Sequence, residues 1–219
     1  MSLKLHFHPL SSFCQKVLMA LYESDIPFEP HIVDLLDERA GAEFKRIWPL
    51  GEFPVLQDTA KGLTIPESSI IIEYLAQHYP GPTELVPRDA DLARETRLRD
   101  RFFDLHVQVP MQKIVTDRLR PEGKTDPVGV EQARAHLETA LGMLDADMAT
   151  RTWATGDVFG MADCAAAPAL FYANLVAPFG DRHKSTAAYY DRLMKRHSFT
   201  RIVREAAPYQ HLFPTQYKQ

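Results

Sequence analysis

Apolar and polar residues alternate in short blocks along the first 80 positions of the chain. The alternation over residues 3–7 predicts a strand, and helical spacing over residues 13–21 predicts a helix. The pattern then predicts an extended segment at 27–33, a helix at 37–47, strands at 53–56 and 63–65, and a helix that opens at Pro66. The order β-α-β-α-β-β-α predicts an α/β domain built on a four-stranded mixed sheet flanked by helices.

The strand pattern stops at a stretch rich in proline. Pro80, Pro82 and Pro87 interrupt the chain there, so residues 81–89 are interpreted as a linker between domains of residues 1–80 and 90–219. Beyond the linker only helical spacing remains, over residues 92–109, 130–148, 162–176, 186–196 and 199–206. Pro110 is expected to bend the first of these helices. The second domain is therefore predicted to be an all-α helical bundle.

Composition narrows the class of protein. The 219 residues are 45% hydrophobic with a net charge of -4, so a broad electrostatic attraction to nucleic acid or to anionic lipid is not expected. The most apolar stretch, residues 165–179, is too short to span a membrane, and Lys4, His6 and His8 interrupt the start where a signal peptide would need an apolar run. We expect a cytoplasmic protein.

The two cysteines, Cys14 and Cys164, cannot form a disulfide framework or a zinc site. The nine histidines are scattered, and no carboxylate or cysteine completes a set of metal ligands around His6 and His8. We therefore expect no bound metal.

The first candidate site lies where the first strand gives way to a helix, at Ser11-Ser12-Phe13-Cys14. Backbone N–H groups are unpaired at such a helix start and favour an anion, including a thiolate, to which a serine hydroxyl can donate a hydrogen bond. Serine is also a preferred N-cap, and from these residues alone helix capping is the favoured explanation of Ser11 and Ser12. Cys14 invites a nucleophile interpretation, although a cysteine one turn inside a helix is typically a packing residue.

Two further motifs precede the linker. Gly51-Glu52-Phe53-Pro54 enters a strand with a proline, which either marks an edge strand or, with a cis peptide bond, turns the backbone of Phe53 toward a ligand. Glu67-Ser68 opens a helix, where the pair suits the zwitterionic end of an amino acid or simply caps the helix. In the second domain, Asp163 lies three residues after Gly160 and is interpreted as half of a capping box, with a structural role.

Taken together in this order and spacing, these motifs resemble those of the cytosolic glutathione S-transferase superfamily, in particular its serine-type, bacterial-like, zeta-like or beta-like members. The resemblance covers residues 3–199. It implies a thioredoxin-like first domain that binds glutathione and a helical second domain that shapes a pocket for an electrophile. It also implies a homodimer, with glutathione as co-substrate and no covalently bound cofactor.

The resemblance assigns roles to individual residues. Ser11 matches the position that activates the glutathione thiol, with Ser12 as the alternative one step away and Cys14 as a third. Phe53, before an expected cis Pro54, matches the residue whose backbone pairs with the cysteinyl part of glutathione, Glu67 and Ser68 match the γ-glutamyl site, and Asp163 matches the folding motif. The electrophile pocket is expected to include Phe102, Phe103, His106 and Phe171.

Two departures from the family pattern affect the expected glutathione site. Trp48 stands where asparagine is usual, and Glu52 adds an acid near the expected glycine carboxylate of glutathione. The cation for that carboxylate is left open among Lys45, Arg39 and His31.

The resemblance leaves several functions open. Conjugation of glutathione to small hydrophobic electrophiles is expected first. A glutathione-dependent isomerase of the maleylacetoacetate type and a thiol–disulfide reductase acting through Cys14 are the enzymatic alternatives. The non-enzymatic alternative is an interaction protein of the stringent-starvation type, which keeps the fold without the activity.

Overall fold

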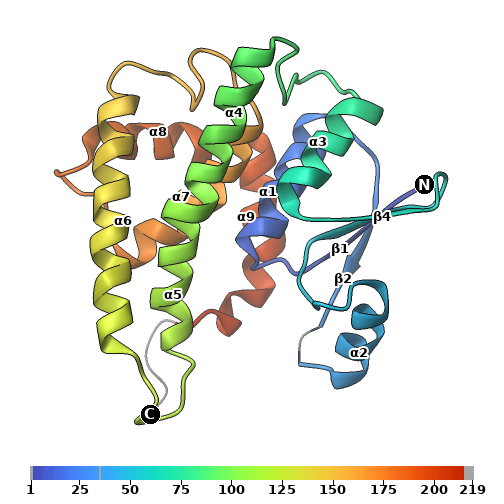
Figure 1. Ribbon diagram of the computed structural model, residues 1–219, viewed down its shortest axis with the longest axis horizontal. Helices are drawn as coiled ribbons and strands as arrows, with labels where there is room; N and C mark the ends of the chain where they lie inside the picture. The colour runs from blue at the N-terminus through green and yellow to red at the C-terminus, as the bar shows by residue number, and fades with distance from the viewer. Residues whose placement is uncertain (1, 35, 215–219) are drawn as a thin grey trace.

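The computed structural model describes residues 2–34 and 36–214 and divides into a sheet domain and a helical domain (Figure 1). The elements of the sheet domain follow the predicted order. They are β1 (Leu3–Phe7), α1 (Ser12–Glu23), β2 (Glu29–Ile32), α2 (Glu38–Ile47), β3 (Val55–Asp58), β4 (Leu63–Pro66) and α3 (Ser68–His78).

The four strands form one mixed sheet in the order β2-β1-β3-β4. β1 runs parallel to β2 and antiparallel to β3, with Leu5 opposite Leu56, and β3 runs antiparallel to β4. Leu5 and Leu56 are fully buried in the main core with α1 and α3, while Phe44 of α2 packs with Val33 and Val55 in a second, smaller core. Hydrophobic burial on both faces thus fixes the sheet between its helices.

The helical domain wraps one side of the sheet domain (Figure 1). The predicted four-stranded mixed sheet and all-helical second domain are therefore confirmed. The elements after the sheet domain are α4 (Ala90–Phe102), the π-helix η1 (Phe103–Gln108), α5 (Val109–Asp117), α6 (Pro127–Met148), α7 (Met161–Val176), α8 (Lys184–Met194), α9 (His197–Ala206) and the 3₁₀-helix η2 (Ala207–Leu212).

Pro110 distorts the first long helix instead of ending it. α4, η1 and α5 follow one another without a break from residue 90 to 117. Proline has no backbone N–H to give to the preceding turn. The chain widens to π geometry just before it, and the Val109 N–H donates to the Asp104 carbonyl five residues earlier.

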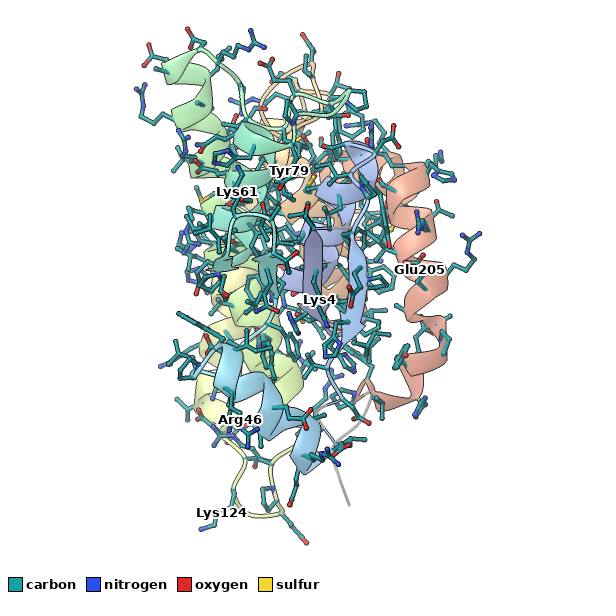
Figure 2. The ribbon with its side chains drawn as sticks, turned by 90° about the vertical axis from the view of Figure 1, so that its right-hand side faces the viewer. Lys4, Arg46, Lys61, Tyr79, Lys124 and Glu205 are labelled. Carbon is teal, nitrogen blue, oxygen red and sulfur yellow. The ribbon has the colours of Figure 1, made fainter. Side chains whose placement is uncertain are left out.

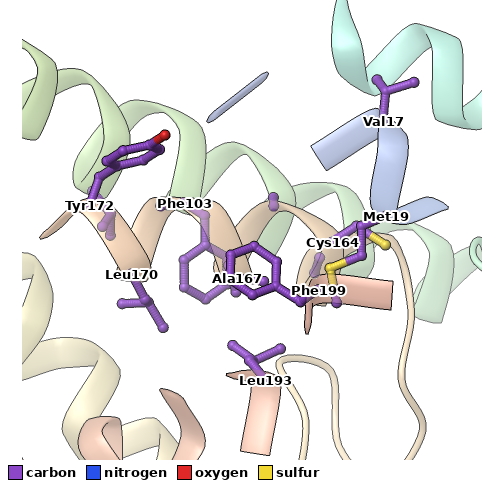
Figure 3. Packing of buried hydrophobic residues seen from close by; sticks show 14 of the residues in the cluster. Val17, Met19, Phe103, Cys164, Ala167, Leu170, Tyr172, Leu193 and Phe199 are labelled. Atoms are coloured by element: carbon purple, nitrogen blue, oxygen red, sulfur yellow. The ribbon is translucent and has the colours of Figure 1, made fainter. Parts of the chain in front are cut away.

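α7 is the buried centre of the helical domain. Its residues pack against α1, α4 and η1, and the close view shows Cys164, Ala167 and Leu170 among side chains from other helices (Figure 3). Asp163 is fully buried at its start. Its carboxylate accepts hydrogen bonds from the Gly160 N–H at 2.9 Å, the Ala154 N–H at 2.9 Å and the Tyr189 hydroxyl at 2.5 Å. Burial raises the pKa of Asp163 to about 6, against the opposing effect of these hydrogen bonds.

Charged side chains cover the outside of both domains. Figure 2 shows Lys4 on the sheet, Arg46 on α2 and Glu205 on α9. In the part of the chain that the structure describes, no helix is both long and apolar enough to cross a membrane.

Candidate functional site

A cavity of about 710 Å³ lies between the two domains. One wall is made by the β1–α1 loop, the segment before β3 and the start of α3, and the other by one face of α4, η1 and α5 (Figure 1). Its size suits a small-molecule site. Six of the side chains predicted from the sequence line it, namely Ser11, Ser12, Phe53, Pro54, Glu67 and Ser68.

Ser11 is the N-cap of α1, and it faces the cavity at the same time. Its Oγ accepts a long hydrogen bond of 3.4 Å from the Cys14 N–H. That contact uses an oxygen lone pair, so the hydroxyl hydrogen remains available for a ligand. The two interpretations of Ser11 from the sequence, helix cap and thiolate donor, are therefore compatible. Ser12 also lines the cavity but is buried as the first residue of the helix.

Cys14 is enclosed beneath the helix start. Its side chain is fully buried, and its Sγ accepts from the His8 N–H at 3.5 Å. Burial raises the pKa of the Cys14 thiol to about 12, although the contacts with Ser11 and His8 act in the opposite direction. The thiol is thus protonated at neutral pH and does not line the cavity, which argues against a reductase that uses Cys14.

The Phe53–Pro54 peptide bond is cis, and both residues line the cavity directly before β3. The Phe53 ring packs between His8, at a centroid distance of 6.0 Å, and Phe44, at 6.3 Å. These contacts fix Phe53 at the edge of the cavity. His8 lines the cavity as well, and burial lowers its pKa, so its imidazole is neutral at pH 7.

Glu67 has an unusual backbone conformation at the N-terminus of α3. Its φ of 69° lies in the left-handed region, which a residue other than glycine rarely occupies. Within the described chain its side chain makes no capping hydrogen bond, so the carboxylate stays exposed at the cavity. The next residue, Ser68, is buried in the first turn of α3. Strained residues cluster at functional sites, and here the strain presents an acid beside a helix start.

A buried charge cluster lies directly behind this wall. Lys16 of α1 is 1% exposed, and its Nζ lies 2.6 Å from Asp100 Oδ1, 2.8 Å from Asp104 Oδ2 and 2.8 Å from Ser69 Oγ. Burial raises the pKa of Asp100, opposed by the charge of Lys16. The cluster joins α1, α3 and the α4–η1 helix, and Asp104 reaches the cavity. Its only signal in the sequence is one lysine among the apolar residues of a helix.

The structure does not place the four expected electrophile-pocket residues in the cavity. Phe103 is buried in the core beside Phe199 and Leu193, as Figure 3 shows. Phe171 packs edge to face on Phe199, at a centroid distance of 5.9 Å. These large rings turn toward the core because hydrophobic burial is more favourable there than at a partly open cavity.

The other two members of that set lie on the outer side of the helical wall. Phe102 contacts the ring of His106, and His106 Nδ1 lies 3.0 Å from Nε2 of His136 on α6. The cavity is instead lined by the next face of the same helix, which carries Leu105, Gln108 and Gln112. A helical projection from Asp104 by steps of four residues would have found this face.

Residues 212–214 complete the helical wall. Phe213 lines the cavity and stacks on Tyr172, with ring centroids 5.4 Å apart and an interplanar angle of 21°. The Tyr172 hydroxyl donates to the Leu10 carbonyl at 2.7 Å, and Arg118 donates to the Pro214 carbonyl at 3.0 Å. The tail is thereby held against the helical domain, and Tyr172 links it to the β1–α1 loop. No sequence motif indicated it.

Of the three cations considered for a carboxylate, none lines the cavity. His31 packs on the ring of His6 on β1, and Arg39 is exposed and paired with Glu43. The stem of Lys45 lies against Gly51, where a Cβ would come within 2.9 Å of Lys45 Cε, and Gly51 lines the cavity. The Lys45 stem thus lies against a residue that lines the cavity. Glu52 does line the cavity.

Comparison with known families covers both domains. Residues 5–83 match the model of the glutathione S-transferase N-terminal domain, and residues 127–192 match that of the C-terminal domain. The first match ends just beyond α3, and the second lies within the helical domain.

Similar proteins include glutathione S-transferases and a protein that is named for its localisation with FtsZ. Over 151 residues the chain is 34% identical to the glutathione S-transferase-like protein LUC7 of Fusarium sp, which covers 69% of this chain and 66% of that protein. It is 29% identical to FtsZ-localized protein A of Caulobacter vibrioides, over 93% of this chain and 92% of that protein. A crystal structure of a glutathione S-transferase from Methylobacillus flagellatus with glutathione bound superimposes with a TM-score of 0.82 at 29% identity, covering 92% of this chain and 98% of that one.

Proposed function

Because the chain belongs to the glutathione S-transferase superfamily, we propose that it is a glutathione transferase that joins the glutathione sulfur to an electrophilic carbon. The observation that carries the proposal is the convergence of Ser11, Phe53, Glu67 and Ser68 on one cavity. These residues are far apart in the sequence and come from three different loops and helix starts.

Ser11 acts on the thiol in this proposal. Its hydroxyl donates a hydrogen bond to the glutathione sulfur, and the start of α1 adds the positive end of the helix dipole. Lowering a thiol pKa from about 8.5 to about 6.5 needs roughly 2.7 kcal/mol, which one donor and a helix start can supply. The thiolate then forms an S–C bond with the electrophile, and the electron pair of the broken bond leaves with the displaced group or takes up a proton.

The rest of glutathione is placed along the sheet-domain wall. Glu67 faces the γ-glutamyl ammonium, and Ser68 with the N–H groups of α3 faces the γ-glutamyl carboxylate. The backbone of Phe53 pairs with the cysteinyl part. Lys45 reaches across Gly51 to the glycine carboxylate and offsets the charge of Glu52.

Titration calorimetry with reduced glutathione tests this placement. We expect saturable binding to the wild-type protein, and about tenfold weaker binding when Glu67→Ala removes the partner of the ammonium, since a hydrogen bond to a charged group contributes about 1.5–3 kcal/mol. Glu131→Ala on the exposed side of α6 is the matched control and should leave the affinity unchanged. Undetectable binding to the wild type contradicts the proposal and favours an interaction protein instead.

We also propose a homodimer, because the joined surface of α3 and α4 exposes apolar side chains. Arg97 of α4 pairs with Glu73 of α3 at 2.8 Å, so the two helices present one surface, on which Ile70 and Leu98 are more than half exposed. Exposed apolar side chains that gather on one surface mark an interaction site.

Sedimentation velocity tests the dimer. The wild type should sediment at twice the chain mass of 24.9 kDa, and Ile70→Glu should shift it to the monomer by placing a charge in the interface. Val158→Glu, at a more exposed apolar position in the loop before α7, is the control. A monomeric wild type rules the dimer out.

A further inference from the structure

The helical wall of the cavity carries a polar stripe. Gln108, Gln112 and Thr116 recur every four residues along η1 and α5, and all three line the cavity. Residues spaced by four share one face of a helix, so the stripe is continuous. A pocket for purely apolar electrophiles has no need of such a stripe.

The π-helix contributes to this arrangement. In η1 the backbone hydrogen bonding spans five residues instead of the four of an α-helix, as between Val109 and Asp104. This part of the wall, which ends at Gln108, therefore holds about one residue more per turn than an α-helix. Within η1, Gln108 lines the cavity, whereas Phe103 is buried in the core. π-turns of this kind occur frequently at functional sites.

Gln108 is the member of the stripe that lacks partners. Its side chain is 5% exposed, and its Oε1 is buried with no hydrogen-bond partner among the residues that the structure describes. A buried amide oxygen without a partner is destabilising, and few persist in native proteins without a reason. Gln108 lines the cavity, so a rotation of its side-chain amide can turn this enclosed oxygen toward a ligand group with an N–H or O–H, which then supplies the missing hydrogen bond.

The charges around the cavity select a neutral group. Arg101 is the one lysine or arginine on the lining within the described ranges, and it already faces Asp104 at 3.5 Å. Glu52 and Glu67 add two further acids to the lining. A carboxylate on the electrophile would therefore meet net negative charge, whereas a hydroxyl or a carboxamide would not.

The helical wall also carries two aromatic rings that line the cavity. Those of Tyr172 and Phe213 stack on each other, and the contact of Arg118 with the Pro214 carbonyl holds the tail in place. Aromatic rings favour offset stacking with a planar ligand.

We propose that the electrophile is an aromatic compound bearing an uncharged hydroxyl or carboxamide, which Gln108 binds while its ring packs on Phe213. The proposal rests on the transferase function proposed above and names the class of its second substrate. Gln108 acts here as a specificity residue for the polar group.

Three isothiocyanates test the inference. Phenethyl isothiocyanate and its 4-hydroxy and 4-carboxy analogues share one reactive carbon, which two methylene groups insulate from the ring substituent. Glutathione adds through its sulfur to that carbon, and the nitrogen takes up the proton, giving a dithiocarbamate. Values of kcat/KM, each divided by the uncatalysed rate constant, then report recognition of the substituent.

For the wild type we expect the 4-hydroxy analogue to be favoured about fivefold over the parent compound, the effect of one hydrogen bond, and the 4-carboxy analogue to be disfavoured. Gln108→Met keeps the volume of the side chain, cannot supply the hydrogen bond and should bring the hydroxyl preference close to one. Gln132→Met, at an exposed position on α6 away from the cavity, should retain it.

Equal use of the parent and 4-hydroxy compounds by the wild type overturns the inference and leaves the transferase proposal standing. A preference for the 4-carboxy analogue, or a hydroxyl preference that survives Gln108→Met, also overturns it. Failure to transfer glutathione to any of the three overturns the transferase proposal together with the inference.

Discussion

Replacement of Ser11 by alanine is expected to lower kcat/KM for glutathione conjugation at least tenfold, a loss of about 1.4 kcal/mol of transition-state stabilisation. The reason is the loss of the hydroxyl that donates to the glutathione sulfur. The fold should remain, because the cap contact of Ser11 is long and an N-cap serine contributes about 1 kcal/mol to stability. Initial rates and thermal unfolding of the same preparation measure both effects.

Ser12→Ala is the matched control for this variant. Both serines line the cavity, but Ser12 is buried as the first residue of α1. We expect Ser12→Ala to retain most of the activity. Full activity in Ser11→Ala together with a large loss in Ser12→Ala would transfer the thiol-activating role to Ser12.

The second large effect is expected at Lys16. Lys16→Met removes the cation that Asp100 and Asp104 share in the interior and should lower the free energy of unfolding by about 3–5 kcal/mol at neutral pH. Lys4→Met is the control, because Lys4 forms a partly exposed ion pair with Glu29 at 3.2 Å, which contributes about 1 kcal/mol or less. Chemical denaturation of both variants measures the difference.

The loss at Lys16 should depend on pH in a defined direction. Burial already raises the pKa of Asp100 above its unfolded value, and removal of the cation raises it further. A group with a raised folded-state pKa contributes stability at low pH and loses it as pH rises through that pKa. The destabilisation should therefore shrink as pH falls toward about 4, the ordinary aspartate value. An equal loss at all pH values would mean that packing of the Lys16 stem, and not its charge, is the stabilising element.

Most of the fold could be predicted from the sequence because each element carries its own local signal. The alternation at residues 3–7 and the three-to-four spacing at residues 130–148 correspond to β1 and most of α6. The larger differences are the π-helix η1, the continuation of the first long helix to residue 117 and the 3₁₀-helix η2; elsewhere the differences lie at the ends of elements, where capping sets the first and last residue. α6 begins three residues earlier than its apolar pattern, because Asp126 caps it by accepting from the Gly129 N–H at 2.9 Å.

The residues of the sheet-domain wall could also be predicted from the sequence, because each motif lies at the start or end of an element. Ser11, Pro54 and Glu67 each mark such a junction, and junctions gather at one edge of the sheet. The structure brings them to one cavity. The conformation of Glu67, with its positive φ, was not foreseen, because glutamate carries no local signal for it.

The helical wall could not be predicted in the same way. The aromatic residues expected in the pocket do not line the cavity, because Phe103 lies in the core and Phe171 packs against it. The buried pairing of Lys16 with Asp100 joins residues 84 positions apart and leaves no local pattern. Such long-range contacts depend on how the two domains pack.

The ionisation of bound glutathione tests the central claim most directly. The ultraviolet absorbance of the thiolate, followed against pH in the presence of saturating wild-type protein, gives the pKa of the bound thiol. We predict a value well below the ordinary thiol pKa of about 8.5, and a return toward it in Ser11→Ala. A thiol that binds and yet titrates at its ordinary value in the wild type would contradict the account.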